Sequence, residues 1–448
     1  MLAIVATLAF VQISLAALAP ARFISISLLI QAIPFTWNLN VDSMVSTPLG
    51  AINVIAIQLF ALCVACLVVV LKNFEQFSYY MGRFKWHGIF IAYCVVSLIY
   101  APSGSYGVRM IAKLLGPMLF MASALVAINT ERQLRDAGRA ILWSGVILAI
   151  MAFIARGAGI SSDPNAVLTG FSGLGPPGMG PPVFAAHMLP VAMLALAVSL
   201  ETRSTATIGM TLLAAFCVIG AFQRTSAAAL FVGCSAITFL GTRGFVRLLL
   251  PISGVLGLPL LIIFNSNFRQ RMFFDAGDSQ ALLKDPLGAL QGINGSGRFS
   301  LWDEMLTRFY TPHPAIGSGI GATQEFLYSR SAIGQGVVHS EYVRLLCELG
   351  VIGLVLFSIA MLSYLITLVR FSRLAGPAFA RTYALAAVGG LVTYLIYMTT
   401  DNSFDYVNQF GAYVFALIAM AVKAREFVRD STQPATSSAT VALANLMR

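Results

Sequence analysis

Long runs without charge are the feature that most constrains this 448-residue chain. A helix that crosses a membrane needs about 20 predominantly apolar residues. Charged residues make up only 10% of the chain, against about 25% in soluble domains, and this disfavours a soluble globular enzyme. Cutting the sequence at its charged residues leaves thirteen candidate spans, at 2–20, 23–38, 50–71, 87–103, 109–128, 140–156, 183–200, 205–223, 225–242, 248–265, 350–369, 382–399 and 404–422. We predict an all-α polytopic membrane protein with about 12–13 transmembrane helices.

The first run leaves the exact number of spans open. It ends in small residues, Ala17 to Ala21, as a signal peptide does, but no basic segment precedes its apolar stretch. We expect a membrane span here, with a short re-entrant or interfacial helix as the alternative. An odd number of spans would place the N-terminus outside, and twelve would place it inside.

Cations divide unevenly between alternate connections. Seventeen Lys and Arg residues and six acids lie in one set of connections and the C-terminal tail, a balance of +11, whereas the rest of the chain has eleven cations and twelve acids, a balance of −1. Because excess Lys and Arg in short loops marks the cytoplasmic side, we predict a cytoplasmic C-terminus and periplasmic connections in the other set. The net charge of +10 thus predicts orientation in a membrane, and no nucleic-acid partner is expected.

One predicted external connection, residues 266–338, is much longer than the others. A loop of this length inside a compact protein is usually functional. Its piece from Gly297 to Tyr310 has the pattern of an amphipathic helix. The apolar side of that helix is formed by Phe299, Trp302, Met305, Leu306 and Phe309. The predicted organisation is an N-terminal transmembrane bundle, a periplasmic catalytic loop, C-terminal transmembrane helices and a disordered cytoplasmic tail, at 1–265, 266–338, 339–424 and 425–448.

Ionisable residues at the external membrane edge are the first candidates for chemistry. Arginine suits an anionic phosphate because its guanidinium is always charged and binds two oxygens at once. The alternative for each such cation is contact with lipid headgroups, but the external turns otherwise avoid Lys and Arg. Five cations lie at this edge: Arg109, Lys113, Arg156, Arg224 and Arg344.

His339 occupies the position best suited to a general base. It ends the long loop and begins a predicted helix that runs to Gly350, just before a membrane span. The dipole at a helix N-terminus favours the neutral imidazole that a base requires, with a helix-capping role as the alternative. The sequence has no D-x-D pair, P-loop or H-E-x-x-H motif, and we expect no metal or cofactor. A histidine base with several arginines suits transfer from a lipid diphosphate to a hydroxyl.

Three motifs follow one another through the long loop and the helix after it. They are Gly297-Arg298-Phe-Ser-Leu-Trp302, then Pro314-Ala-Ile-Gly317-Ser-Gly319-Ile-Gly321, then Val338-His339-Ser340-Glu341-Tyr342 with Glu348-Leu-Gly350-Val-Ile-Gly353 downstream. A fourth, Gln223-Arg224-Thr-Ser226, lies at an external span end. In order and spacing these motifs resemble those of the O-antigen ligase and polymerase family of bacterial envelope glycosyltransferases. Ser340 departs from that pattern, in which Asn is common.

The resemblance implies a metal-independent, inverting glycosyltransferase of the bacterial inner membrane with a periplasmic active site. Its donor would be a glycan linked to undecaprenyl diphosphate. Its acceptor would be the lipid A core for a ligase, or another lipid-linked repeat unit for a polymerase. His339 would take the acceptor's proton, and Arg224 and Arg298 would bind the diphosphate. Supporting residues are expected at Glu341, Tyr342, Arg344, Arg109, Lys113 and Arg156.

Several alternatives stay open. Glu341, Arg344 and Glu348 lie along one side of the predicted helix, and they either orient His339 or pair with each other. A transporter or flippase of lipid-linked sugars would also need many uncharged spans, but such proteins tend to have internal repeats and cations in mid-span, and the sequence shows neither. A structural scaffold for envelope assembly is a third hypothesis. Ligase and polymerase are not distinguished by the sequence, because both need the same base and diphosphate site.

Overall fold

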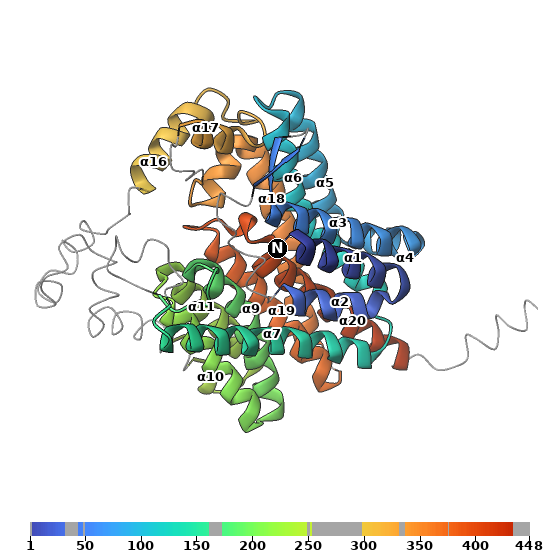
Figure 1. The fold of residues 1–448 in the computed structure, drawn as a ribbon. Coiled ribbons are helices and arrows are strands. Elements are labelled where there is room, and N and C mark those ends of the chain that lie inside the picture. Colours follow the sequence, from blue (N-terminus) through green and yellow to red (C-terminus); the bar gives the residue numbers. More distant parts are fainter. Residues whose placement is uncertain are drawn as a thin grey trace, which may run out of the picture.

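The computed structural model describes residues 2–31, 44–47, 50–160, 173–248, 251–252, 298–330, 337–374 and 376–432. Over these residues the chain is almost wholly helical (Figure 1). Its only described strands form one short antiparallel hairpin, β1 (Met44–Thr47) with β2 (Gly50–Asn53). The predicted class, an all-α polytopic membrane protein, is confirmed.

Seven stretches among the described residues are long and apolar enough to cross a membrane. They are α6 (Gly104–Ala127), α7 (Glu131–Gly157), α9 (Pro181–Thr202), α11 (Arg224–Gly241), α18 (Glu341–Arg373), α19 (Ala378–Tyr397) and Val407–Ser431, which combines η6 (Val407–Gly411) with α20 (Ala412–Thr432). An eighth candidate is a bent pair, α3 (Val54–Lys72) and α4 (Phe74–Arg83), whose axes turn by 103°.

Four predicted spans form shorter apolar helices, and one falls almost wholly outside the described residues. The shorter helices are α1 (Leu2–Leu18), α2 (Pro20–Ile30), α5 (Lys85–Val96) with η3 (Ser97–Ile99), and α10 (Thr205–Gly220). The 16 residues of α10 rise about 24 Å, which is less than a hydrocarbon core of about 30 Å. Of the predicted span 248–265, only residues 248, 251 and 252 are described.

The C-terminal helices form the centre of the bundle (Figure 1). The most apolar 18-residue stretch within Val407–Ser431 is wholly buried inside the bundle. Helix α20 packs on α6 and α19, and α19 also packs on α9 and α11. Small residues allow the close approach: a Cβ added to Gly389 would lie 2.5 Å from Ile237, and one added to Gly233 would lie 2.4 Å from Thr393. Small residues at such contacts are typical of membrane helix bundles.

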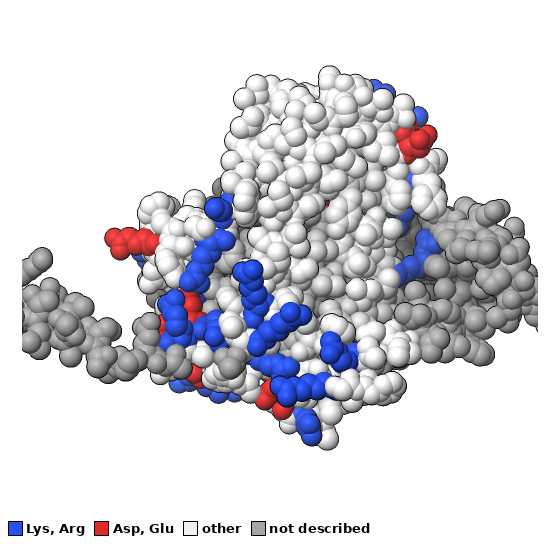
Figure 2. Space-filling view, turned by 180° about the vertical axis from the view of Figure 1, so that it is seen from behind, with Lys and Arg blue, Asp and Glu red and all other residues white. Residues whose placement is uncertain are grey.

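Helix ends gather at two opposite sides of the bundle. On one side Arg381 donates to the carbonyl oxygens of Leu240 and Gly241, at 3.2 and 3.0 Å. On the other, the Tyr397 hydroxyl donates to the Pro182 carbonyl at 2.9 Å. Figure 2 shows Lys and Arg gathered toward the lower left, below a dome that carries almost no charge. An uncharged surface of this size suits lipid rather than water.

The described part of the long loop packs as a small separate cluster. It consists of α16 (Arg298–Met305), the π-helix η4 (Leu306–Tyr310) and α17 (Ala322–Arg330). Met305 is fully buried, with Trp302, Leu306 and Phe309 packed around it as predicted. The prediction was wrong for Phe299, which is 59% exposed. It lies in the first turn of α16, outside the buried cluster, and contacts Trp302 edge-on at 5.5 Å between ring centroids.

Candidate active site

The helix that follows His339 is broken at Gly350. This glycine has a φ of +65°, a conformation that glycine adopts without steric cost. A Cβ at this position would lie 2.3 Å from the carbonyl oxygen of Ala315. Residues 341–349 therefore form a short helix of their own, and 351–373 form the longer helix that continues into the bundle, in agreement with the boundary predicted at Gly350.

The glycine-rich turn 314–321 fills this break. The backbone N–H groups of Ser318 and Gly319 donate to the carbonyl oxygens of Cys347 and Glu348, each at 2.9 Å. These carbonyls would otherwise lack partners, because the broken helix has no N–H group one turn further on. The second and third sequence motifs are thus joined by backbone hydrogen bonds, which hold the short helix after His339 in place.

The Glu348 side chain also binds to this glycine-rich turn and does not take part in the ion pairs along its helix. Its carboxylate is 2% exposed and accepts hydrogen bonds from the Gly321 backbone N–H at 2.8 Å and from the Thr323 hydroxyl. A buried carboxylate needs such donors, since burial without them is costly.

His339 lies in the turn before the short helix, and the helix cap is its neighbour. The Ser340 hydroxyl accepts from the Val343 backbone N–H at 3.4 Å, so the capping role falls to serine. His339 has a φ of +58°, which is uncommon for a residue with a Cβ. Asn402 holds it there: the His339 backbone N–H donates to Asn402 Oδ1 at 2.9 Å, and Asn402 Nδ2 lies 3.2 Å from His339 Nδ1.

The turn 400–402, between α19 and the 3-10 helix η5 (Ser403–Asp405), gathers the predicted site residues. Arg298 Nη1 donates to the Thr400 carbonyl oxygen at 2.6 Å. The Thr400 hydroxyl is hydrogen-bonded to that of Thr225, which directly follows Arg224 at the start of α11. One turn therefore contacts His339, Arg298 and the first turn of α11, which are far apart in the sequence.

A buried ionic network lies next to this turn. Arg344, only 1% exposed, pairs with Glu341 at 3.1 Å and with Asp405 at 3.3 Å. Lys113 pairs with the same Asp405. The backbone N–H of Phe404 donates to Glu341 at 2.8 Å. Of the two roles considered for Glu341 and Arg344, the structure shows mutual pairing.

The surroundings of His339 favour its neutral form. Burial lowers the pKa of His339 and the nearby Arg298 guanidinium lowers it further, while Asp401 and Asp405 act in the opposite direction. Asp405 behaves in the opposite sense: burial raises its pKa, but Lys113 and Arg344 outweigh that effect and lower the pKa to about 2. At neutral pH the site thus holds an uncharged imidazole beside an ionised, fully engaged carboxylate.

Comparison with known proteins agrees with these motifs. Residues 209–358 match the family model described as O-antigen ligase. The chain therefore contains an O-antigen ligase domain. The matched O-antigen ligase domain contains Arg224, Arg298 and His339 and ends inside α18. A search of curated proteins found no match. The match supports glycosyltransferase-type activity in a membrane and lends no support to the transporter hypothesis.

The other predicted residues lie at varied distances from this site. The Tyr342 hydroxyl donates to the Leu395 carbonyl at 3.0 Å and so ties α18 to α19. Arg109 is exposed, with its guanidinium 5.4 Å from the Tyr106 ring centroid. Arg156 is exposed in the last turn of α7. Of the three cations inferred to line the site, the structure connects Lys113 to it, through Asp405.

Sequence reasoning missed the turn that organises the site. The connection between the predicted spans 382–399 and 404–422 was given no role, yet in the structure its Asn402 holds His339. Asp405, predicted to lie in the second of these spans, holds Arg344 and Lys113. A signal was present, since two acids, Asp401 and Asp405, lie close together at the external membrane edge. Both Asp401 and Asn402 lie outside the matched O-antigen ligase domain.

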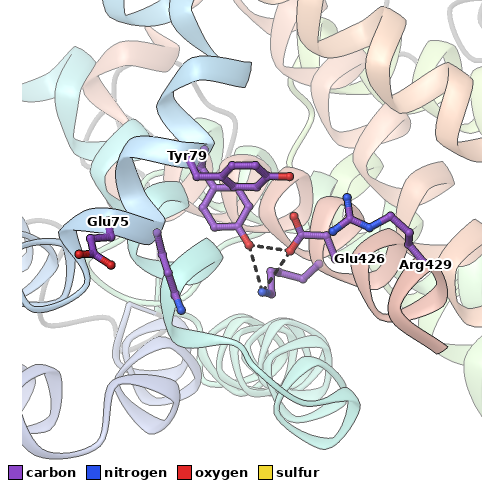
Figure 3. A pocket seen from close by; sticks show the side chains of 7 residues that line it. Glu75, Tyr79, Glu426 and Arg429 are labelled. Carbon is purple, nitrogen blue, oxygen red and sulfur yellow. Dashed lines mark hydrogen bonds and ion pairs between the residues drawn. The ribbon is translucent and has the colours of Figure 1, made fainter. Parts of the chain in front are cut away.

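A cavity of about 390 Å³ lies at the opposite end of the bundle, between α4 and α20. Figure 3 shows Glu75 and Tyr79 on one wall and Glu426 and Arg429 on the other. The Tyr80 hydroxyl donates to Glu426 at 2.6 Å, and Lys423 lies 3.2 Å from the same carboxylate. None of the seven lining residues was predicted as a site residue. The contacts anchor α4 on the end of α20 and do not involve His339.

Proposed function

We propose that this protein transfers a glycan from undecaprenyl diphosphate to a hydroxyl of an acceptor glycan in surface polysaccharide biosynthesis. The observation that carries the proposal is the convergence of His339 and Arg298 on the turn 400–402, within and beside an O-antigen ligase domain. A polyprenyl diphosphate keeps its tail in lipid and its head at the membrane surface. The turn 400–402 joins two membrane-length stretches, and so it lies at the depth where that head would be.

Arg298 and Arg224 supply positive charge for the leaving diphosphate. Arg298 is half-buried and uses one N–H group on Thr400, while a guanidinium has five such donors in a fixed fork. Arg224 begins α11, where the helix N-terminus adds its own partial positive charge. Charge neutralisation by preorganised donors lowers the barrier to departure of an anionic group.

His339 acts as the base in this proposal. As the acceptor oxygen attacks the anomeric carbon, its proton passes to the imidazole, the bond between that carbon and the diphosphate oxygen breaks, and the diphosphate leaves with the electron pair. Attack from the face opposite the leaving group inverts the anomeric centre.

No metal ion is required in this scheme because arginines carry the positive charge. The acids near His339 are also already engaged: Glu341 pairs with Arg344, and Asp405 pairs with Arg344 and Lys113. Asp401 accepts from the Asn402 backbone N–H and from the Tyr406 hydroxyl. Among the residues that the structure describes, no group of three or more His, Cys, Asp or Glu side chains is arranged to hold a metal.

We place the site on the periplasmic face of the bacterial inner membrane. The support is the charge asymmetry: the end that contains the α11–α19 contact of Arg381 and the α4–α20 contact of Lys423 carries the connections rich in Lys and Arg. Excess Lys and Arg marks the cytoplasmic side. The end of α20, and with it the C-terminus, is then cytoplasmic, and His339 faces the periplasm.

The test is incubation of purified protein with lipid-linked repeat units, with and without lipid A core. A ladder of products from repeat units alone would identify a polymerase, and product that appears only with lipid A core would identify a ligase. The His339→Ala variant should make neither, whereas His313→Ala, an exposed histidine in the same loop region, should behave as wild type. Donor lipid that crosses a bilayer with its glycan unchanged would instead support a flippase.

A further inference from the structure

Asn402 is held rigidly beside His339. It is only 4% exposed. Its backbone N–H donates to Asp401 Oδ1 at 2.8 Å, and its carbonyl oxygen accepts from the Asp405 backbone N–H at 3.0 Å. Both sides of its peptide backbone are therefore fixed, and the side-chain amide reaches His339 from a defined position.

The contacts of Asn402 determine which way its amide points. The His339 backbone N–H can only donate, so the atom 2.9 Å from it has to be the amide oxygen. The atom that faces His339 Nδ1, at 3.2 Å, is then the amide nitrogen. An amide nitrogen can only donate a hydrogen bond.

The tautomer of His339 follows from this orientation. Nδ1 must present a lone pair to the amide N–H, and a neutral imidazole carries its single proton on the other nitrogen. We propose that Asn402 is a positioning residue that holds His339 in the tautomer whose proton is on Nε2. Its meaning for catalysis rests on the function proposed above, but the tautomer itself can be observed without any substrate.

The two ring nitrogens then have different tasks. Nε2–H can only donate, which suits an anionic diphosphate oxygen. The lone pair that takes the acceptor's proton is that of Nδ1, so Asn402 has to release its hydrogen bond during the transfer. Until then, the amide N–H directed at Nδ1 opposes protonation of His339 at that nitrogen.

The Asn402→Asp variant isolates this effect. A carboxylate keeps an acceptor for the His339 backbone N–H, and so it preserves the turn. It presents an acceptor instead of a donor to Nδ1, so the imidazole proton should move from Nε2 to Nδ1. A nearby negative charge also favours protonated histidine.

The direct test is ¹⁵N NMR of protein labelled on histidine and reconstituted in bilayers, with the His339 signals assigned by their loss in His339→Gln. At neutral pH we expect an unprotonated Nδ1 and a protonated Nε2 in the wild type, and a protonated Nδ1 in Asn402→Asp. Asn129→Asp, an exposed position at the opposite end, should leave the spectrum of His339 unchanged. A wild-type Nδ1 that carries the proton would overturn the proposal, as would an unchanged tautomer in Asn402→Asp.

A pH profile of glycan transfer separates positioning from a merely structural role. In Asn402→Asp the acid limb should move to higher pH by about one unit or more, while thermal unfolding in detergent stays close to that of the wild type. An acid limb that does not move would contradict the assignment. If the predicted tautomer is found but the wild type transfers no glycan, the proposed function fails and the tautomer stands; if transfer occurs with Nδ1 protonated, the inference fails and the function stands.

Discussion

Two charge clusters lie at opposite ends of this bundle, and they differ in what surrounds them. Beside His339, Arg344 and Lys113 engage Glu341 and Asp405. At the other end Lys423 and Arg83 engage Glu426, which also accepts from Tyr80. Each cluster joins elements that are distant in the sequence. Only the second borders the cavity of about 390 Å³.

This difference shows that neither ion pairs nor a cavity is enough to identify a catalytic site. The cluster beside His339 pairs two cations with two acids, and the cluster at the other end pairs two cations with one acid. The cluster beside His339 is distinguished by its neighbours, since a neutral imidazole and a half-buried Arg298 meet at the adjoining turn. Around Glu426 the contacts fasten α4, which is bent away from α3, to the end of α20. Each prediction below tests this contrast.

The largest effect is expected from loss of the base. Replacement of His339 by Ala should lower the rate of glycan transfer by about 10²–10⁴-fold, the usual contribution of a general base. Transfer assays on purified protein measure it, and normal insertion and thermal unfolding should accompany the loss. Full activity in this variant would remove His339 from the mechanism.

Breaking the two clusters should affect stability unequally. Arg344→Met leaves Glu341 and Asp405 buried without their shared partner, which should cost about 3–5 kcal/mol. Lys423→Met leaves Glu426 with Tyr80 and Arg83, so we expect about 1 kcal/mol. Thermal unfolding in one detergent compares them. Equal losses would show that the two clusters have the same structural role.

Loss of Arg298 should slow the reaction without unfolding the protein. We expect Arg298→Gln to lower the rate of transfer by about 10²-fold, because it removes a charged donor from the departing diphosphate. Arg308→Gln is the matched control, since Arg308 follows closely in the same segment but lies over the Phe326 ring at 4.2 Å. A similar loss in both variants would point to disruption of the α16–η4 segment instead.

The smallest effect is a shift in pH dependence. Burial and Arg298 lower the pKa of His339, so transfer should persist below the ordinary histidine pKa of about 6.5 and fall only when the imidazole is protonated. In Arg298→Gln the acid limb should lie at higher pH. The same lowered pKa means that folded protein loses stability as pH falls below about 6.5, where the unfolded chain binds the proton more readily. An acid limb at the same pH in both proteins would contradict this account.

Helix positions were largely predictable from the sequence. Hydropathy is a local property, so twelve of the thirteen candidate spans coincide with described helices, although four of these are shorter than a full span. The helix after His339 was also predicted to run to Gly350, the residue at which the structure breaks α18. Phe299 was misplaced because a helical pattern indicates the side of a helix and not where the packed cluster ends.

The sequence by itself determined that this chain is a helical membrane protein with an O-antigen ligase domain, because composition and motif spacing are carried by neighbouring residues. Only the tertiary structure decided what holds His339. Asn402 lies 63 residues further along the chain, and nothing in the local pattern links the two. Their contact exists because α18, α19 and α20 pack together, and that packing determines which nitrogen of the imidazole carries the proton.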